Sequence, residues 1–392
     1  MSTTCKAISA ESIVQTLRAC FPAHERLALH EPFFGGSEDA YVSDCVTTGW
    51  VSSVGAYVDR FEQDLAAYTG AKHAIAVVNG TAALHISLKL AGVQPDDEVL
   101  CPALTFVATA NAISYCGAIP HFIDSESNTL GVDAGKLSDY LKDIAVEDGE
   151  SYRNKRTGRT LKAIVPVHTL GHPVDLDPII EVCERYRLEL VEDAAESLGS
   201  TYKGRHTGTF GIANAISFNG NKIITTGGGG AILTDNTPLA TRAKHLVTTA
   251  KQPHPWKYEH DALGYNYRLP NINAALGCAQ LEKLPQLLKW KRSIYSTYQT
   301  AFSETPQVRI VGEPDSSQSN YWLNALQIQG DRSFRDAIIE SAHLQGIAVR
   351  PMWSLLNTMP MYLEAPAMDL DTSERLEQQI ISLPSSAILG AP

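Results

Sequence analysis

The sequence predicts an α/β fold, in which a large, doubly wound, mixed but mostly parallel sheet domain precedes a small α+β domain. Short continuous apolar runs alternate with helical patterns over the first two thirds of the chain. Continuous rather than alternating apolar runs are typical of parallel strands covered on both faces. The length of 392 residues suits one large domain with an appendage, and an apolar fraction of 44% can build a sizeable core.

The first units alternate in the order helix, strand, helix. Phe61, Leu65 and Tyr68 share one helical face that closes at Gly70, and a short apolar run at 74–78 predicts a strand. A second helical pattern follows the Asn-Gly-Thr at 79–81. Further strands are expected at 98–101, 119–124, 161–168 and 188–193. Such a sheet binds ligands beyond the carboxyl ends of its strands.

The later elements differ in their connections. Strands at 212–218 and 230–234 are joined by a link too short for a helical crossover, which predicts a local reversal. Residues 235–300 follow a helical pattern, and the polar stretch 143–159 is interpreted as a solvated excursion. We expect the large domain to span 1–300 and the small one 301–392, with strands at 308–311, 321–328 and 347–350 and a helix at 332–345.

Composition excludes several classes of protein. A net charge of −11 opposes binding to a nucleic-acid backbone. No apolar run reaches the ~18 residues of a membrane span, and residues 1–30 lack the layout of a signal peptide, so the cytoplasm is the expected compartment. The seven cysteines form no C-x-x-C, and no histidine spacing predicts a metal site.

Two possible ligand sites follow strands. Gly80, Thr81 and Ala82 lie where a strand gives way to a helix, so their backbone N–H groups could hold a phosphate. An ordinary turn is the alternative. Asp193 ends an apolar run and could pair with a cationic ring nitrogen, although Asp is also a favoured helix N-cap.

Lys222 is a lone cation in the uncharged stretch 210–234, followed by four consecutive glycines. A desolvated lysine amine is the nucleophile that a Schiff base requires. No Walker or Rossmann glycine motif is present, so a nucleotide-binding dehydrogenase has only glycine richness in its favour.

Together, a phosphate turn, a strand-end Asp and Ser217-x-x-x-x-Lys222 indicate a pyridoxal-phosphate (PLP) enzyme. In this interpretation the lysine holds the aldehyde as an imine. Asp193 keeps the pyridine nitrogen protonated, and backbone amides with the Ser217 hydroxyl hold the phosphate.

At these residues the chain resembles the DegT/StrS-like sugar aminotransferases, which are fold-type-I PLP enzymes. The matching motifs are Gly49-Trp50-Val51-Ser52, Phe61-Glu62, Asn79-Gly80-Thr81-Ala82-Ala83-Leu84, Pro102-Ala103-Leu104-Thr105-Phe106, Pro166-Val167-His168 with Gly171 and Asp175, Glu192-Asp193-Ala194-Ala195, Ser217 to Lys222, and Gly264-Tyr265-Asn266-Tyr267-Arg268-Leu269. The resemblance covers nearly the whole chain.

The resemblance implies a role for each matched residue. Lys222 corresponds to the Schiff-base lysine, Asp193 to the partner of the ring nitrogen, and Phe106 to the aromatic side chain stacked on the ring. Thr81, Ala82 and Ser217 correspond to phosphate ligands. Asn266 corresponds to an asparagine that reaches the phosphate from the neighbouring subunit, which implies a homodimer with shared active sites. Glu196 departs from the Gln or His that contacts the ring hydroxyl in many relatives.

The resemblance is nearest to the legionaminic-acid and bacillosamine branch, carried by 208–211 and 217–230. It implies transfer of an amino group from L-glutamate to C4 of a UDP- or GDP-linked 4-keto-6-deoxy-N-acetylhexosamine. Arg268 could bind the diphosphate or form a dimer salt bridge, and Trp50 could line the sugar site or belong to the core. A PLP- or sugar-binding regulatory protein without turnover is the competing hypothesis.

Overall fold

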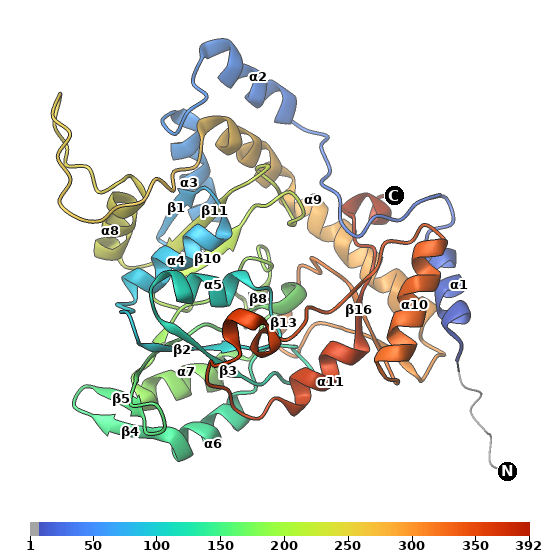
Figure 1. Cartoon of the computed structure of the whole chain (residues 1–392). Helices are drawn as coiled ribbons and strands as arrows, with labels where there is room; N and C mark the ends of the chain where they lie inside the picture. The colour runs from blue at the N-terminus through green and yellow to red at the C-terminus, as the bar shows by residue number, and fades with distance from the viewer. Residues whose placement is uncertain (1–7) are drawn as a thin grey trace.

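The computed structural model describes residues 8–392, and its large domain is built on one mixed sheet (Figure 1). The strands lie in the order β3 (Ile119–Ile123), β2 (Glu98–Pro102), β6 (Thr160–Ile164), β7 (Glu189–Leu190), β10 (Asn214–Ser217), β11 (Gly230–Thr234) and β1 (His73–Val77). A parallel bridge between Asp193 and Ala215 joins β7 to β10. Along this path only β11 runs antiparallel to its neighbours. The expected fold class and the reversal between β10 and β11 are confirmed.

Helices cover both faces of this sheet. One face packs against α4 (Gly80–Leu90), α5 (Ala108–Tyr115) and α8 (Thr237–Val247). On the other face, α3 (Ala56–Thr69) and α9 (Asn271–Ala301) cover the β1 end, while α6 (Ala134–Ile144) and α7 (Leu176–Tyr186) cover the β3 end. This double cover explains why the strands read as continuous apolar runs.

The polar stretch 143–159 is mostly exposed, as expected, but it has regular structure. It forms a hairpin of β4 (Ala145–Asp148) and β5 (Ser151–Asn154), and β5 pairs with β6. Side-chain contacts also tie the hairpin to the domain, among them the packing of Tyr152 against the core and a hydrogen bond from Asn154 to the buried Glu98 carboxylate at 2.9 Å. These contacts come from distant sequence, which a local polar pattern does not reveal.

The small domain is an antiparallel sheet in the order β12 (Val308–Ile310), β14 (Ala325–Ile328), β16 (Ile380–Ser382) and β15 (Arg350–Pro351), with α10 (Arg332–Leu344) and α11 (Asp371–Gln379). The first helix, α1 (Ala10–Cys20), shares its core, since Ile13 and Leu17 pack with Ile338. The division at residue 300 stays a prediction. The apolar face of α1 is covered by α10 and by Ile294 and Tyr298 near the end of α9.

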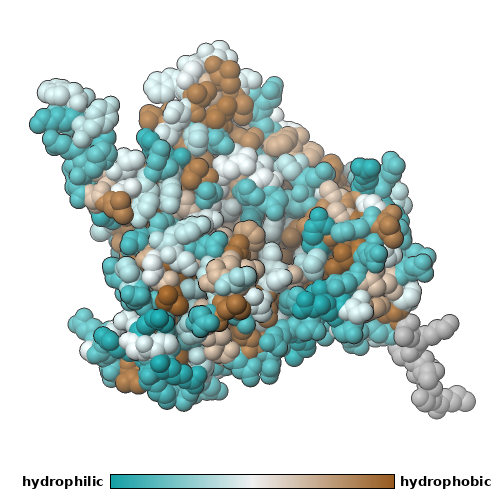
Figure 2. Space-filling view, in the orientation of Figure 1, coloured by the Kyte–Doolittle hydropathy of each residue, from teal (hydrophilic) through white to brown (hydrophobic). Residues whose placement is uncertain are grey.

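The surface and the cysteines complete this picture. Figure 2 shows apolar surface at the α2 (Glu38–Thr48) end of the molecule, where Val46, Trp50, Val51 and Val54 are exposed.

Among residues 8–392, no helix is both long and apolar enough to cross a membrane, and no group of three or more His, Cys, Asp or Glu could hold a metal ion. The cysteines of that part of the chain are free, and Cys5 lies outside it.

Candidate active site

A cavity of about 340 Å³ opens beyond the carboxyl ends of β6, β7 and β10, where this sheet class binds ligands. Its walls come from the large domain and from two tryptophans beyond residue 301. The lining residues are Asn79, Gly80, Thr81, Thr105, Phe106, Ala108, Val167, Asp193, Ala195, Glu196, Ser217, Asn219, Asn221, Lys222, Trp322 and Trp353. The cavity thus brings together Lys222, Asp193, Ser217 and the 79–81 turn, as the sequence predicts.

The N-terminus of α4 forms one wall of the cavity. Asn79 caps this helix, and its Oδ1 accepts the Ala82 N–H at 2.8 Å. A Cβ on Gly80 would lie 2.8 Å from the Ser217 Cβ, so only glycine lets the helix start sit against Ser217. Helix N-terminal amides beside a hydroxyl form an anion site. The Ala82 amide is already bound by Asn79, and Ala82 does not line the cavity.

Asp193 forms a second wall and is 8% exposed. Its Oδ2 accepts from Thr109 Oγ1 at 2.8 Å, and its Oδ1 accepts from the Ala195 N–H at 3.2 Å. Burial raises the pKa of this carboxyl, and the Thr109 and Ala195 hydrogen bonds oppose that rise. Turns rather than a helix follow Asp193, so it caps no helix. A cation beside it would stabilise its ionised form.

Lys222 forms an ion pair with Glu196, which lies three residues after Asp193. The Lys222 Nζ lies 3.3 Å from Glu196 Oε1 and 3.9 Å from the ring centre of Trp322. Glu196 Oε2 accepts the Leu170 N–H at 2.9 Å. Burial raises the pKa of Glu196, which the charge of Lys222 opposes. The side chains of Lys222 and Glu196 are 12% and 7% exposed, so they form a largely desolvated pair.

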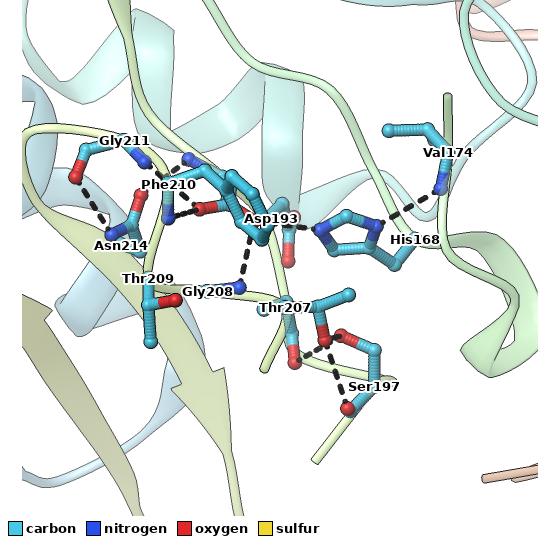
Figure 3. A network of polar contacts seen from close by, with 12 residues as sticks. His168, Val174, Asp193, Ser197, Thr207, Gly208, Thr209, Phe210, Gly211 and Asn214 are labelled. Atoms are coloured by element: carbon cyan, nitrogen blue, oxygen red, sulfur yellow. Dashed lines mark hydrogen bonds and ion pairs between the residues drawn. The ribbon is translucent and has the colours of Figure 1, made fainter. Parts of the chain in front are cut away.

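A buried network behind the cavity fixes the backbone that carries Asp193. The fully buried Glu192 carboxylate accepts the N–H groups of Gly208, Phe210 and Gly211 at 2.7, 2.6 and 2.9 Å. It also contacts His168 Nε2 at 3.0 Å. Figure 3 shows His168, Gly208, Phe210 and Gly211 converging beside Asp193. Both ring nitrogens of His168 are thus bound within this network, to Glu192 and to the Val174 N–H, which gives His168 a structural role.

Three participants escape sequence reasoning. Thr109, which holds Asp193, lies inside the unremarkable apolar helix α5. Trp322 lies in the 321–328 run that predicts a strand, but β14 begins only at Ala325. Trp353 lies 6.4 Å from Phe106 across the cavity, ring centre to ring centre. No local motif marks these residues, because chain packing alone brings them to the cavity.

Besides Ala82, three of the residues proposed from the sequence lie outside the cavity of their own chain. Trp50 is 58% exposed, which rules out the alternative that it belongs to the core. Asn266 is exposed, and its Oδ1 accepts from Arg268 Nε at 3.0 Å. Neither Asn266 nor Arg268 lines the cavity.

The residues present suit PLP. The α4 start with Ser217 provides an anion site. Asp193 is a buried carboxyl whose ionised form a ring cation would stabilise, and Lys222 supplies a partly desolvated amine. When bound, PLP supplies an aldehyde for the amine and a ring that acts as an electron sink. Phe106 is 52% exposed and lines the cavity, where it is available to contact a ring.

Comparisons with known proteins identify relatives of this chain. The chain is 38% identical over 339 residues to the putative pyridoxal phosphate-dependent aminotransferase EpsN of Bacillus subtilis (86% of this chain, 84% of EpsN). It is 37% identical over 369 residues to GDP-perosamine synthase of Caulobacter vibrioides (92% of this chain, 94% of the relative). The crystal structure of DesI in the presence of its TDP-sugar product superimposes with a TM-score of 0.82 at 26% identity (93% of this chain, 89% of DesI). Residues 34–391 match the DegT/DnrJ/EryC1/StrS aminotransferase family, and the chain therefore belongs to this family of PLP-dependent sugar aminotransferases.

Proposed function

We propose that this enzyme moves an amino group from L-glutamate to C4 of a nucleotide-linked 4-keto-6-deoxy-(N-acetyl)hexosamine, in the cytoplasm, for a bacterial surface sugar. The observation that carries the proposal is the Lys222 amine, which faces the same cavity as the Asp193 carboxylate and the start of α4. An amine, a carboxylate and an anion site are the three groups that PLP-dependent transamination requires of a protein. A lysine at this position supports transamination.

The names of the relatives support a nucleotide-linked substrate. One relative is a GDP-perosamine synthase, and DesI was solved in the presence of a TDP-sugar. The chain's resemblance to the legionaminic-acid and bacillosamine branch favours an N-acetylated hexosamine. The candidate nucleotides are therefore GDP, UDP and TDP.

Lys222 is the proposed proton carrier. Once glutamate has displaced the Lys222 amine from the cofactor, Nζ takes the proton from glutamate Cα in the first half of the reaction. It returns a proton to sugar C4 in the second half, and the face of delivery sets the configuration of the new amine. Glu196 Oε1, at 3.3 Å from Nζ, orients the amine and balances its charge while it is protonated.

Asn266 and Arg268 are proposed to act across a homodimer. Both lie outside the cavity of their own chain, on the segment that follows the exposed 251–263 loop. In a shared site Asn266 would reach the phosphate of the partner, and Arg268 the diphosphate of the substrate. The exposed apolar residues at the α2 end support such an interface, since large apolar patches mark association surfaces. Trp50 belongs to that patch.

The glutamate half-reaction separates an enzyme from a regulatory protein. The PLP-loaded protein is mixed with glutamate alone, while the visible absorbance of the lysine-bound cofactor and the release of 2-oxoglutarate are followed. We expect the band to bleach with one 2-oxoglutarate released per site. An unchanged band with glutamate bound would favour a regulatory protein, and NAD binding without that band would favour a dehydrogenase.

A further inference from the structure

A tryptophan from beyond residue 301 touches Lys222 in two ways. The Trp322 indole is 4% exposed, and its Nε1–H donates to the carbonyl of Asn221 at 2.6 Å. Its ring centre lies 3.9 Å from the Lys222 Nζ. One side chain therefore holds both the peptide before Lys222 and the amine at its end.

The loop that carries Trp322 is itself anchored at several points. The Trp322 N–H donates to Asn320 Oδ1 at 2.8 Å, and Asn320 Nδ2 donates to the carbonyl of Glu196 at 2.8 Å. The carbonyl of Trp322 accepts from the fully buried Lys291 Nζ on α9 at 2.6 Å. A Cβ on Gly171 would lie 1.9 Å from Asn320 Oδ1, so the close approach needs glycine there. The indole is thus a fixed platform.

The platform and a carboxylate contact the amine together. An indole face attracts an ammonium group most strongly where water is excluded, and the Lys222 side chain is 12% exposed. Glu196 contacts Nζ, and the charge of Lys222 also acts on Asp193 and His30. Burial, together with the charges of Lys291 and Lys222, lowers the pKa of His30, which favours the neutral form of its ring.

We propose that Trp322 is a positioning residue for Lys222: its N–H holds the peptide before Lys222, and its indole face holds the amine beside Glu196 whenever the amine is free of cofactor. Between the two half-reactions the free amine then stays in one position, between the indole face and the Glu196 carboxylate. This inference rests on the role of Lys222 in the proposed function. It adds a residue from beyond residue 301 to that role.

The test measures the amine itself in the full-length, PLP-free protein. Lys222 is acetylated with acetic anhydride across a pH series, and the modified Lys222 peptide is quantified by mass spectrometry. In Trp322→Leu we expect the pH of half-modification to fall by about one unit, or about tenfold faster modification at lower pH, because the protonated amine loses its aromatic face. Trp322→Phe keeps a face and should shift less.

Trp353→Leu is the matched control, since Trp353 lines the same cavity but contacts Phe106 instead of the amine. In Trp353→Leu, Lys222 should be acetylated with the same pH dependence as in the wild-type protein. A wild-type profile in folded Trp322→Leu, or an equal shift in Trp353→Leu, would overturn the proposal. If Trp322→Leu does not fold, Trp322→Phe decides: a smaller downward shift supports the proposal, and a wild-type profile refutes it.

The two proposals fail separately. Turnover by Lys222→Arg would refute the proposed function, whereas the modification profile of the PLP-free protein would stand. Conversely, an unshifted modification profile in the Trp322 variants would refute the positioning role of Trp322 and leave the proposed transaminase chemistry of Lys222 unaffected.

Discussion

Replacing Glu192 by Gln should destabilise the protein without touching the cavity. The Val174 N–H donates to His168 Nδ1, so Nε2 is the ring nitrogen that donates to Glu192. The wild-type carboxylate therefore faces four donors, and each of its oxygens accepts from two of them. A Gln can accept on one oxygen only, and its NH₂ group must face the other two donors.

The magnitude follows from those two donors. A buried donor without an acceptor costs about 1–3 kcal/mol, so Glu192→Gln should lose about 2–6 kcal/mol of unfolding free energy. Hydrogen–deuterium exchange of the 207–213 peptide should quicken by at least about 30-fold, because a local opening becomes cheaper by about 2 kcal/mol or more. Urea unfolding reports the global loss.

The pH dependence gives a second check. Burial alone would raise the pKa of Glu192, but the hydrogen bonds from His168, Gly208 and Gly211 outweigh it and the pKa lies below its ordinary value. This group thus stabilises the fold fully above its unfolded pKa of about 4.3, and that contribution is lost as the pH falls through the lower folded pKa. The difference in unfolding free energy between wild type and Glu192→Gln should therefore become smaller in that acid range.

Glu189→Gln is the control for this prediction. Its side chain is 37% exposed and lies 3.8 Å from Lys162, so its loss should change the unfolding free energy by less than about 1 kcal/mol. The reasoning is refuted if Glu192→Gln unfolds within about 0.5 kcal/mol of wild type, or if the 207–213 peptide exchanges at the wild-type rate.

The remaining predictions concern the cavity. Lys222→Arg should keep the fold by circular dichroism and lose at least about 100-fold of its product rate; a rate within tenfold of wild type would contradict the assignment. Asp193→Asn should bind PLP by absorbance but slow the glutamate half-reaction by about 10²–10³-fold, and an unchanged rate would remove Asp193 from that role. Ser217→Ala should weaken PLP binding about ten- to a hundredfold in equilibrium titration, since a hydrogen bond to a charged group is lost; equal affinity would argue against phosphate contact.

The sequence predicts the parts of the site that carry their own local signal. Lys222 stands alone in an uncharged stretch, Asp193 ends an apolar run, and Gly80 begins a helix. All three line one cavity because parallel strands end at one edge of the sheet. Strand limits were less predictable: the 188–193 run is a strand only over β7, although its backbone keeps bonding to Ile164 and Pro166.

What the sequence does not predict depends on contacts between distant segments. Trp322 reaches Lys222 from 100 positions along the chain, and Thr109 reaches Asp193 from another strand–helix unit. The polar 143–159 stretch becomes a hairpin through Asn154 and Glu98, which pair only in the folded sheet. The packing of α1 against α10 likewise depends on contacts between distant segments.

The central claim is most directly tested by following nitrogen from donor to product. The PLP-loaded enzyme is incubated with ¹⁵N-glutamate and, separately, with GDP-, UDP- and TDP-linked 4-keto-6-deoxy sugars, with and without an N-acetyl group. The account predicts one nucleotide-linked amino sugar that carries ¹⁵N at C4 by mass and NMR, and none with Lys222→Arg. The absence of labelled amino sugar from the whole panel, or label at another carbon, would contradict it.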